Sequence, residues 1–368
     1  MITGLKIRFP LIPRLVRRVS RPHRRLRARQ TLAHQSAFAG VLLERLAQEG
    51  QLDPVGRTLS IASTVLTRSD VVVAMLADRA TGQVRATLKL PLTPDAEWSL
   101  ARHRHVIMTL HDLPELRPFC SLVPKAIAWG SHAGHPYFVE TALQGRPASD
   151  LVDQIGLLSD VQQSAARALL LLHTATARRS VIDEATFQRL AGADLQWLTQ
   201  LAGSWPSSAL LLRKLEQLER LLRDRLLGRE LPLAWIHGDF WLGNLLVQGP
   251  REPLTGVIDW DRAAPQEIPL HDVFHLLVYT RKLVRNSEPG EEVVDYLLPA
   301  AFGRQERTLV DTAIAALDLP DSADFLSAMA LLYWLRGAAV NLTRYPAFRT
   351  DGKWLSKNAF LVLKRGIT

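Results

Sequence analysis

The chain is poor in cysteine and contains no long uninterrupted apolar run. Its one cysteine, Cys120, excludes an internal disulfide and any metal site built from several thiolates, and it is typical of a reducing compartment such as the cytoplasm. The longest apolar stretch runs from Phe325 to Leu335 and ends at Arg336. It is shorter than the roughly 18 residues of a membrane span, which predicts a core helix. With 368 residues, the chain is long enough for about two domains or one bilobal enzyme.

Acidic residues are absent from residues 6–29, where ten Lys or Arg side chains occur. The formal charge of the chain is +9, so these ten charges leave −1 for the rest. The high pI therefore belongs to this segment, which argues against a nucleic-acid-binding body. The segment is too often interrupted by charge for a secretory signal. Its mixture of apolar and basic residues leaves three interpretations: a solvated tail, an anionic membrane or partner contact, and a nucleic-acid contact.

The most informative pattern is His-Gly-Asp-Phe-Trp-Leu-Gly-Asn at residues 237–244, followed by Val-Ile-Asp-Trp-Asp at residues 257–261. Asp239 and Asn244 are five positions apart, which suits a tight loop with both polar side chains facing one cavity. Two short apolar strands, 245–247 and 255–258, flank a turn-forming stretch, and such a hairpin brings Asp259 back beside Asn244. The pattern predicts an acid that accepts a hydroxyl proton and two oxygen ligands for Mg²⁺, as phosphoryl transfer requires.

These residues resemble the H-R-D-x-x-x-x-N loop and D-F-G motif of protein kinases. Gly238 in place of Arg, and the acid after Trp260, indicate a narrower group. The chain resembles the aminoglycoside phosphotransferase and choline kinase-like family of small-molecule kinases, over about residues 55–345. The resemblance implies an α+β, bilobal, protein-kinase-like fold, with a small antiparallel β lobe and a larger, mainly helical lobe. It also implies a phosphotransferase that uses ATP, or alternatively GTP, and Mg²⁺.

The resemblance assigns a role to each matching residue. Asp239 would be the catalytic base, and Asn244 and Asp259 would bind Mg²⁺. Structural support would come from His237, Asp261 and Asp272. Asp272 would brace the catalytic loop through backbone hydrogen bonds. Without the resemblance, His-Gly-Asp would be an ordinary turn and Asp259 the cap of a strand end.

Residues 58–92 have the texture of a β-sheet, with strands near 59–61, 71–76 and 84–90. Lys89 alternates with Leu88 and Leu90, so it lies on the opposite face of its strand. Its context, Ala-Thr-Leu-Lys, resembles the Val-Ala-Ile-Lys strand of kinases, which implies that Lys89 holds the nucleotide phosphates. The alternative is a solvent-facing lysine on an edge strand. The turn at residues 67–70, between the first two of these strands, offers backbone amides and the Ser69 hydroxyl to the same phosphates.

In the family, a helical glutamate pairs with this lysine. Glu97 is the only acid on the predicted helix 96–110, and the family's usual glutamate position falls near His103. Either Glu97 reaches Lys89 from the first turn, or the ion pair is replaced. Two further strands, 126–129 and 136–141, lead into Leu-Gln-Gly, which resembles the family's hinge. Backbone groups from Glu140 to Ala142 would bind the adenine edge, unless Glu140 is an exposed linker residue.

Three segments are expected: a basic segment at 1–30, an N-terminal nucleotide-binding lobe at 31–143, and a helical lobe at 144–368 with the catalytic loop and acceptor site. Only residues 260–271 separate Asp259 from the helix at Asp272, too few for the peptide-binding segment of a protein kinase. A hydroxyl of a small molecule is therefore the expected acceptor: an aminoglycoside, a sugar or an amino alcohol. The competing hypothesis is an inactive kinase-fold binding module.

Overall fold

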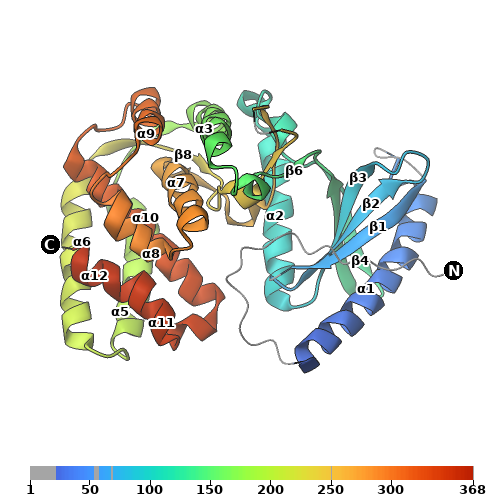
Figure 1. Ribbon diagram of the computed structural model, residues 1–368, viewed down its shortest axis with the longest axis horizontal. Helices are drawn as coiled ribbons and strands as arrows, with labels where there is room; N and C mark the ends of the chain where they lie inside the picture. Colours follow the sequence, from blue (N-terminus) through green and yellow to red (C-terminus); the bar gives the residue numbers. More distant parts are fainter. Residues whose placement is uncertain (1–21, 54–57, 68, 250, 368) are drawn as a thin grey trace. The chain divides into compact units, whose positions relative to one another are not determined.

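The computed structural model describes residues 22–53, 58–67, 69–249 and 251–367, and the chain divides into two compact units (Figure 1). Unit 1 comprises Met1–Asp150, Leu245–Gly249 and Leu254–Arg262, and unit 2 the remainder. The sequence-based division assigned all of 144–368 to the helical lobe. The hairpin after the catalytic loop groups with unit 1 because its first strand pairs with a strand of that unit. Most of the basic segment, residues 1–21, lies outside the described residues.

Within the described residues, unit 1 contains a five-stranded antiparallel sheet with the order β1-β2-β3-β5-β4. Strands β3 and β5 are neighbours in the interior of the sheet, and each is hydrogen-bonded to a strand on both of its sides. The strands are β1 (Leu59–Leu66), β2 (Val71–Asp78), β3 (Val84–Pro91), β4 (Ala126–His132) and β5 (His135–Thr141). Each of them contains a strand that the sequence predicts.

Helix α1 (Pro22–Gln48) packs along one face of this sheet (Figure 1). Leu42 and Leu46 are fully buried there, together with Leu88 and Leu90 of β3. Each such leucine stabilises the unit by about 2 kcal/mol through burial. Lys89 therefore points to the opposite face, as the alternation along β3 predicts.

Helix α2 (Pro94–Asp112) covers the part of the sheet that carries Lys89. Pro94 occupies its first turn, and the Thr93 hydroxyl caps it by accepting a hydrogen bond from the Ala96 N–H at 3.2 Å. His103 lies on the buried side of the helix, and its ring contacts Phe138 of β5 edge-on, with centroids 5.8 Å apart. The helix therefore fixes the depth at which His103 meets the sheet.

A second, smaller sheet of unit 1 joins β6 (Arg146–Pro147), β9 (Leu245–Val247) and β10 (Leu254–Val257). The predicted hairpin is confirmed, because β9 and β10 are antiparallel and Leu245 pairs with Val257. The chain thus enters β9 from Asn244 and leaves β10 toward Asp259 at the same end of the hairpin. Gly145 precedes β6 with φ +125°, and a Cβ there would lie 2.6 Å from the Thr255 hydroxyl, so glycine is required.

Unit 2 is mainly helical, and its short sheet has the order β11-β8-β7. The strands are β7 (Arg178–Val181), β8 (Glu230–Ile236) and β11 (Ala264–Glu267); the helices are α3 (Ile155–Thr176), α4 (Glu184–Phe187), α5 (Ala193–Ala202), α6 (Ser208–Leu226), α7 (Leu270–Arg285), α8 (Pro289–Glu292), α9 (Arg304–Leu317), α10 (Ala323–Arg344), α11 (Gly352–Leu355) and α12 (Leu361–Arg365). Among the described helices, α10 alone is long and apolar enough to cross a membrane, but 72% of its apolar window is buried in the structure. It is a core helix, as expected, and the α+β fold class is confirmed.

Candidate active site

The loop that contains Asp239 begins where β8 ends, and a buried carboxylate holds its backbone. His237 is fully buried, and its N–H donates to Asp272 Oδ2 at 2.7 Å. The Gly238 N–H donates to Asp272 Oδ1 at 2.8 Å, and Gly238 has φ +77°, a conformation that glycine adopts without strain. The His237 ring also accepts a hydrogen bond from the Asp239 N–H, through Nδ1, at 3.2 Å. Asp272 and His237 thus set the path of the chain into Asp239.

Asp272 is itself fully buried at the start of α7. Burial alone would raise its pKa, but a hydrogen bond from His173 and the charges of neighbouring histidines outweigh it and lower the pKa of Asp272 below the ordinary value. His173 Nε2 lies 3.2 Å from Asp272 Oδ2. A carboxylate that stays ionised can accept both loop N–H groups, so His173 packs in the core and also keeps the brace charged.

Asp239 is oriented by its neighbour in the motif. Asn244 is buried, and its Nδ2 donates to the Asp239 backbone oxygen at 2.9 Å and to Asp239 Oδ2 at 3.2 Å. The Asp239 side chain keeps 19% of its surface exposed, so a hydroxyl can reach the carboxylate. His275 of α7 also approaches it, with Nε2 3.2 Å from Asp239 Oδ1. The His275 ring is stacked on Tyr279 at a centroid distance of 4.1 Å.

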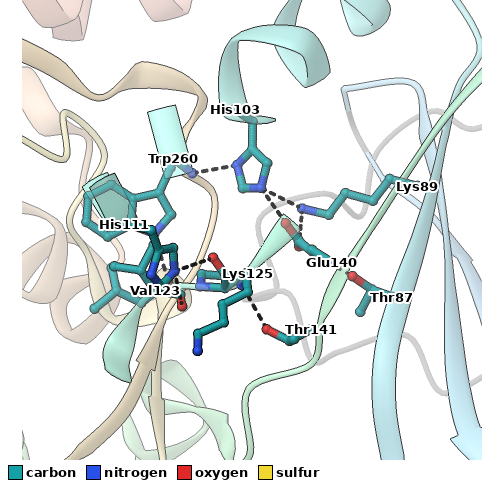
Figure 2. A network of polar contacts seen from close by, with 11 residues as sticks. Thr87, Lys89, His103, His111, Val123, Lys125, Glu140, Thr141 and Trp260 are labelled. Atoms are coloured by element: carbon teal, nitrogen blue, oxygen red, sulfur yellow. Dashed lines mark hydrogen bonds and ion pairs between the residues drawn. The ribbon is translucent and has the colours of Figure 1, made fainter. Parts of the chain in front are cut away.

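In unit 1, the partner of Lys89 comes from β5 and not from α2. Lys89 Nζ lies 2.6 Å from Glu140 Oε1, and Glu140 is 3% exposed (Figure 2). Burial would raise the pKa of Glu140, but the Lys89 charge and the neighbouring His103 lower it to about 2. Glu97 is exposed on the first turn of α2. The ion pair of Lys89 with a helical glutamate is therefore replaced by an ion pair with Glu140, and Glu97 is not its partner.

His103 occupies the helix position where the resemblance places a glutamate, and it makes contacts on both sides of its ring (Figure 2). Nε2 lies 2.6 Å from Glu140 Oε2 and 3.4 Å from Lys89 Nζ. Nδ1 accepts a hydrogen bond from the Trp260 N–H at 3.1 Å. Trp260 is fully buried, and its indole N–H donates to the Val257 carbonyl at 2.8 Å.

Asp259 directly precedes Trp260, is exposed, and has φ +70°. A left-handed backbone costs a residue other than glycine about 1–2 kcal/mol, and such strain is typical of functional sites. Asp261 on the other side accepts a hydrogen bond from the Ser99 hydroxyl of α2 at 2.5 Å. The backbone of Trp260 and the side chain of Asp261 therefore tie the turn of Asp259 to α2.

The remaining predicted nucleotide contacts lie elsewhere in unit 1. Ser69 lies in the turn between β1 and β2, where its hydroxyl is 3.2 Å from that of Thr67; Arg68 lies outside the described residues. The Ala142 N–H donates to the Arg85 carbonyl at 2.9 Å, and the neighbouring Thr141 N–H donates to the Lys125 carbonyl at 2.9 Å. Both N–H groups are thus used within the sheet, so the predicted adenine contact through them lacks a free donor. Glu140 is not the exposed linker of the alternative interpretation, since it is buried.

A model of the phosphotransferase enzyme (APH) family matches residues 72–309, which is more than half of the chain. The chain belongs to the phosphotransferase enzyme family. The family match spans Lys89, Asp239 and Asp259, so it covers the catalytic loop and the motif after β10. No curated protein matches this sequence.

Solved structures of aminoglycoside phosphotransferases share the fold of this family member. The crystal structure of aminoglycoside phosphotransferase APH(4)-Ia has a TM-score of 0.54 and 16% sequence identity, over 86% of this chain and 98% of that chain. A thermostable mutant of APH(4)-Ia, in a ternary complex with AMP-PNP and hygromycin B, has a TM-score of 0.53 and 16% identity, over 86% and 98% of the two chains. At such identities the likeness shows the fold.

Sequence reasoning missed two side chains that the structure places against the predicted site residues Lys89 and Asp239. The sequence predicts a role only for the backbone of Glu140, because no local pattern reveals that a side chain on β5 reaches Lys89 on β3. His275 follows Asp272 by three positions, so a helix that starts near 270 places both on one face, and that spacing was the available signal. His103 was noted only as the place where a glutamate was missing.

The Glu140 carboxylate predicts a specific dependence of stability on pH. Its folded-state pKa of about 2 is below the ordinary 4.5, so its stabilisation is complete above pH 4.5 and is lost as the pH falls toward 2. This amounts to about 3 kcal/mol at most. In Glu140→Gln, the free energy of unfolding measured with urea should fall less steeply between pH 4.5 and pH 2.5. Glu97→Gln, an exposed carboxylate on α2, should keep the wild-type slope; equal slopes in all three proteins would contradict the prediction.

Proposed function

We propose that the protein is an ATP-dependent phosphotransferase that moves the γ-phosphate to a hydroxyl of a small molecule. The observation that carries the proposal is the Asp239 loop. Asp272 holds its backbone, Asn244 orients its carboxylate, and 19% of the Asp239 side chain stays open to an acceptor. A positioned carboxylate that takes the hydroxyl proton is what such transfer needs, since most of the acceleration comes from positioning and electrostatics.

Two oxygen donors fit Mg²⁺. The Nδ2 of Asn244 is used in hydrogen bonds to Asp239, which leaves Oδ1 to offer to a metal ion. Asp259 offers an exposed carboxylate. No group of three or more His, Cys, Asp or Glu side chains suited to a metal occurs among the residues that the structure describes. Mg²⁺ takes one or two protein ligands and completes its shell with phosphate oxygens and water. When bound, it would neutralise charge on the phosphates.

Lys89 and the nucleotide form the other part of the proposal. Lys89 would orient the phosphates, and the buried Glu140 keeps its charged end in place. The complex of APH(4)-Ia with AMP-PNP supports ATP as the donor, and GTP is the alternative. Ser69 would contribute its hydroxyl and the backbone of its turn.

The acceptor is proposed by class. The hygromycin B complex of APH(4)-Ia supports a small polyhydroxylated molecule. Three carboxylates at and just after α8 have basic partners, which makes them less available to a cationic amine: Glu291 pairs with Lys357 at 2.6 Å, Glu292 with Arg281 at 2.9 Å, and Asp295 with Arg365 at 3.4 Å. These pairs favour a sugar-like acceptor over a simple amine. A transfer screen over aminoglycosides, sugars, nucleosides and amino alcohols, with labelled ATP, tests the proposal; transfer to none, combined with no Mg-dependent ATP binding, would refute it.

The competing function is a non-catalytic binding module. The observation that favours it is the departure at Lys89, whose partner is on β5 and not on the helix. An inactive module would show neither transfer nor slow hydrolysis of ATP, whereas a kinase hydrolyses ATP slowly in Mg²⁺ without an acceptor. The two functions are therefore separated by measuring both ATP binding and hydrolysis.

We further propose that residues 1–30 hold a cytoplasmic enzyme at an anionic membrane surface. The support is the sequence: ten basic residues between 6 and 29, interleaved with apolar ones. Each basic side chain near such a surface contributes about 1 kcal/mol, and salt weakens the attraction.

Deleting residues 1–30 should remove binding to anionic vesicles and leave ATP hydrolysis unchanged. Leu32 and Phe38 of α1, which pack against the core of the sheet, lie beyond the deleted residues and are kept. Co-sedimentation at low and high salt measures the effect. A full-length variant in which the basic residues of 6–21 are replaced by Gln keeps the segment but removes these charges. It should lose vesicle binding as the deletion does. Equal sedimentation of all three proteins would leave the solvated tail as the explanation.

A further inference from the structure

The side chains around Lys89 form one buried network that ends at the backbone beside Asp259 (Figure 2). Lys89 and His103 both contact the Glu140 carboxylate, one at each oxygen, at 2.6 Å. The Thr87 hydroxyl donates to Glu140 Oε1 at 3.3 Å. Glu140 is 3% exposed and His103 2% exposed, so water competes little for these bonds.

The bonds of the His103 ring determine its tautomer. Nδ1 accepts from the Trp260 N–H at 3.1 Å, so Nδ1 carries no proton. The proton must therefore be on Nε2, from where it is donated to Glu140 Oε2. A ring protonated at both nitrogens would direct an N–H at the Trp260 N–H. His103 thus bridges a carboxylate and a backbone amide, which a glutamate at this position could not do, since it has no donor for Glu140.

Helix α2 contacts the turn of Asp259 at two points. Ser99 and His103 are four residues apart and so lie on one face of the helix. Ser99 donates to the Asp261 side chain at 2.5 Å, and His103 accepts from the Trp260 N–H. These contacts hold the strained Asp259, at φ +70°, from its C-terminal side.

We propose that His103 is a positioning residue that couples Lys89 to Asp259. Through Nε2 it orients Glu140, which holds the Lys89 ammonium; through Nδ1 it holds the amide that follows Asp259. In the family, the carboxylate that pairs with the lysine comes from the helix; here Glu140 on β5 supplies it. His103, at the helix position of the family's glutamate, links Glu140 to the turn that contains Asp259. The inference rests on the proposed function, because it assigns Lys89 to the phosphates and Asp259 to Mg²⁺.

Conservative variants separate the two sides of the ring. His103→Asn keeps an acceptor near the Nδ1 position but cannot reach Glu140. His103→Gln keeps a donor near the Nε2 position but loses the acceptor for Trp260, and His103→Leu loses both. Calorimetry with AMP-PNP in Mg²⁺ and in EDTA gives the affinity and its Mg²⁺ dependence. We expect the Gln variant to lose mainly the Mg²⁺ dependence, the Asn variant to lose affinity in both conditions, and the Leu variant to lose at least about tenfold in affinity and the Mg²⁺ dependence as well.

A carboxylate swap tests the network without relying on loss alone. Glu140→Gln should weaken nucleotide binding about tenfold or more, because Lys89 loses its anion. His103→Glu combined with Glu140→Gln returns the acid to the helix, where the His103 ring now lies 3.4 Å from Lys89, and should recover most of the affinity measured in EDTA. The Mg²⁺ dependence should stay impaired in the double variant, because a carboxylate that pairs with Lys89 does not occupy the Nδ1 position that accepts from the Trp260 N–H.

His105→Gln, on an exposed position of the same helix, is the control and should leave binding and thermal unfolding unchanged. In an Asp259→Asn background, His103→Gln should have no further effect on the Mg²⁺ dependence, because the two act on one ligand. Additive effects, or wild-type binding in the folded Asn, Gln and Leu variants, would overturn the coupling while the proposed function stands. A wild-type protein that binds no nucleotide in Mg²⁺ would overturn both.

Discussion

Replacing Asp239 with asparagine should reduce phosphoryl transfer about 10²–10⁴-fold while nucleotide affinity stays within about twofold of wild type. The change removes the proposed proton acceptor and leaves the proposed metal ligands, Asn244 and Asp259, intact. The loop should keep its shape, because Asp272 binds the backbone N–H groups before residue 239, and an asparagine oxygen can still accept from Asn244. Single-turnover transfer and calorimetry on the same preparation give the two quantities.

The control for this variant is Asp295→Asn, which alters an exposed carboxylate of unit 2 that pairs with Arg365. It should transfer at the wild-type rate. Near-normal turnover in Asp239→Asn would show that Asp239 is not the base. A loss of transfer accompanied by an equal loss of affinity would instead show that the substitution disturbs the nucleotide site.

Replacing Asp259 with alanine should abolish the Mg²⁺ dependence of nucleotide binding, a loss of about 100-fold or about 2.7 kcal/mol, because it removes the charged ligand. Asn244→Ala should weaken the same dependence less, since a neutral ligand is lost. Calorimetry with AMP-PNP in Mg²⁺ and in EDTA measures both. Unchanged affinity in Mg²⁺ in both variants would show that these residues do not bind the metal.

A glycine at position 259 separates loss of the ligand from damage to the fold. Asp259 has φ +70°, which glycine adopts without the cost that other residues bear, whereas alanine keeps that cost. Asp259→Gly should therefore lose the Mg²⁺ dependence as fully as the alanine variant and unfold at a urea concentration no lower than wild type. A glycine variant that is destabilised as well would mean that the Asp259 side chain supports the turn itself.

Local patterns predicted a large part of the fold because they report on local physics. The alternation of Leu88, Lys89 and Leu90 defined a strand with a buried face and a polar face, and the sheet has that arrangement. The turn-forming stretch after residue 247 predicted the hairpin of β9 and β10. The ends and irregular turns of helices depend on packing, so local patterns do not predict the start of α1 at Pro22 or the π-helical turn at residues 188–192 before α5.

The strands around the catalytic loop were not predicted. β8 leads directly into the catalytic loop and lies between β7 and β11 in its sheet. Because β8 is buried on both faces, Glu230–Ile236 lacks the polar alternation of a half-exposed strand. A short continuous apolar run of this kind cannot be assigned by periodicity alone. Pairing partners far away in the sequence decide its conformation.

The sequence by itself determined the family of this protein: the spacing of Asp239, Asn244 and Asp259 predicts a phosphotransferase, and the family model matches over these residues. Only the tertiary structure decided which carboxylate faces Lys89. Glu140 is 51 residues away along the chain but lies on the neighbouring strand, and its side chain forms the ion pair with Lys89. A burial-driven fold brings these groups together without any local signature, because the energy of a buried ion pair depends on distance in space and not on separation in sequence.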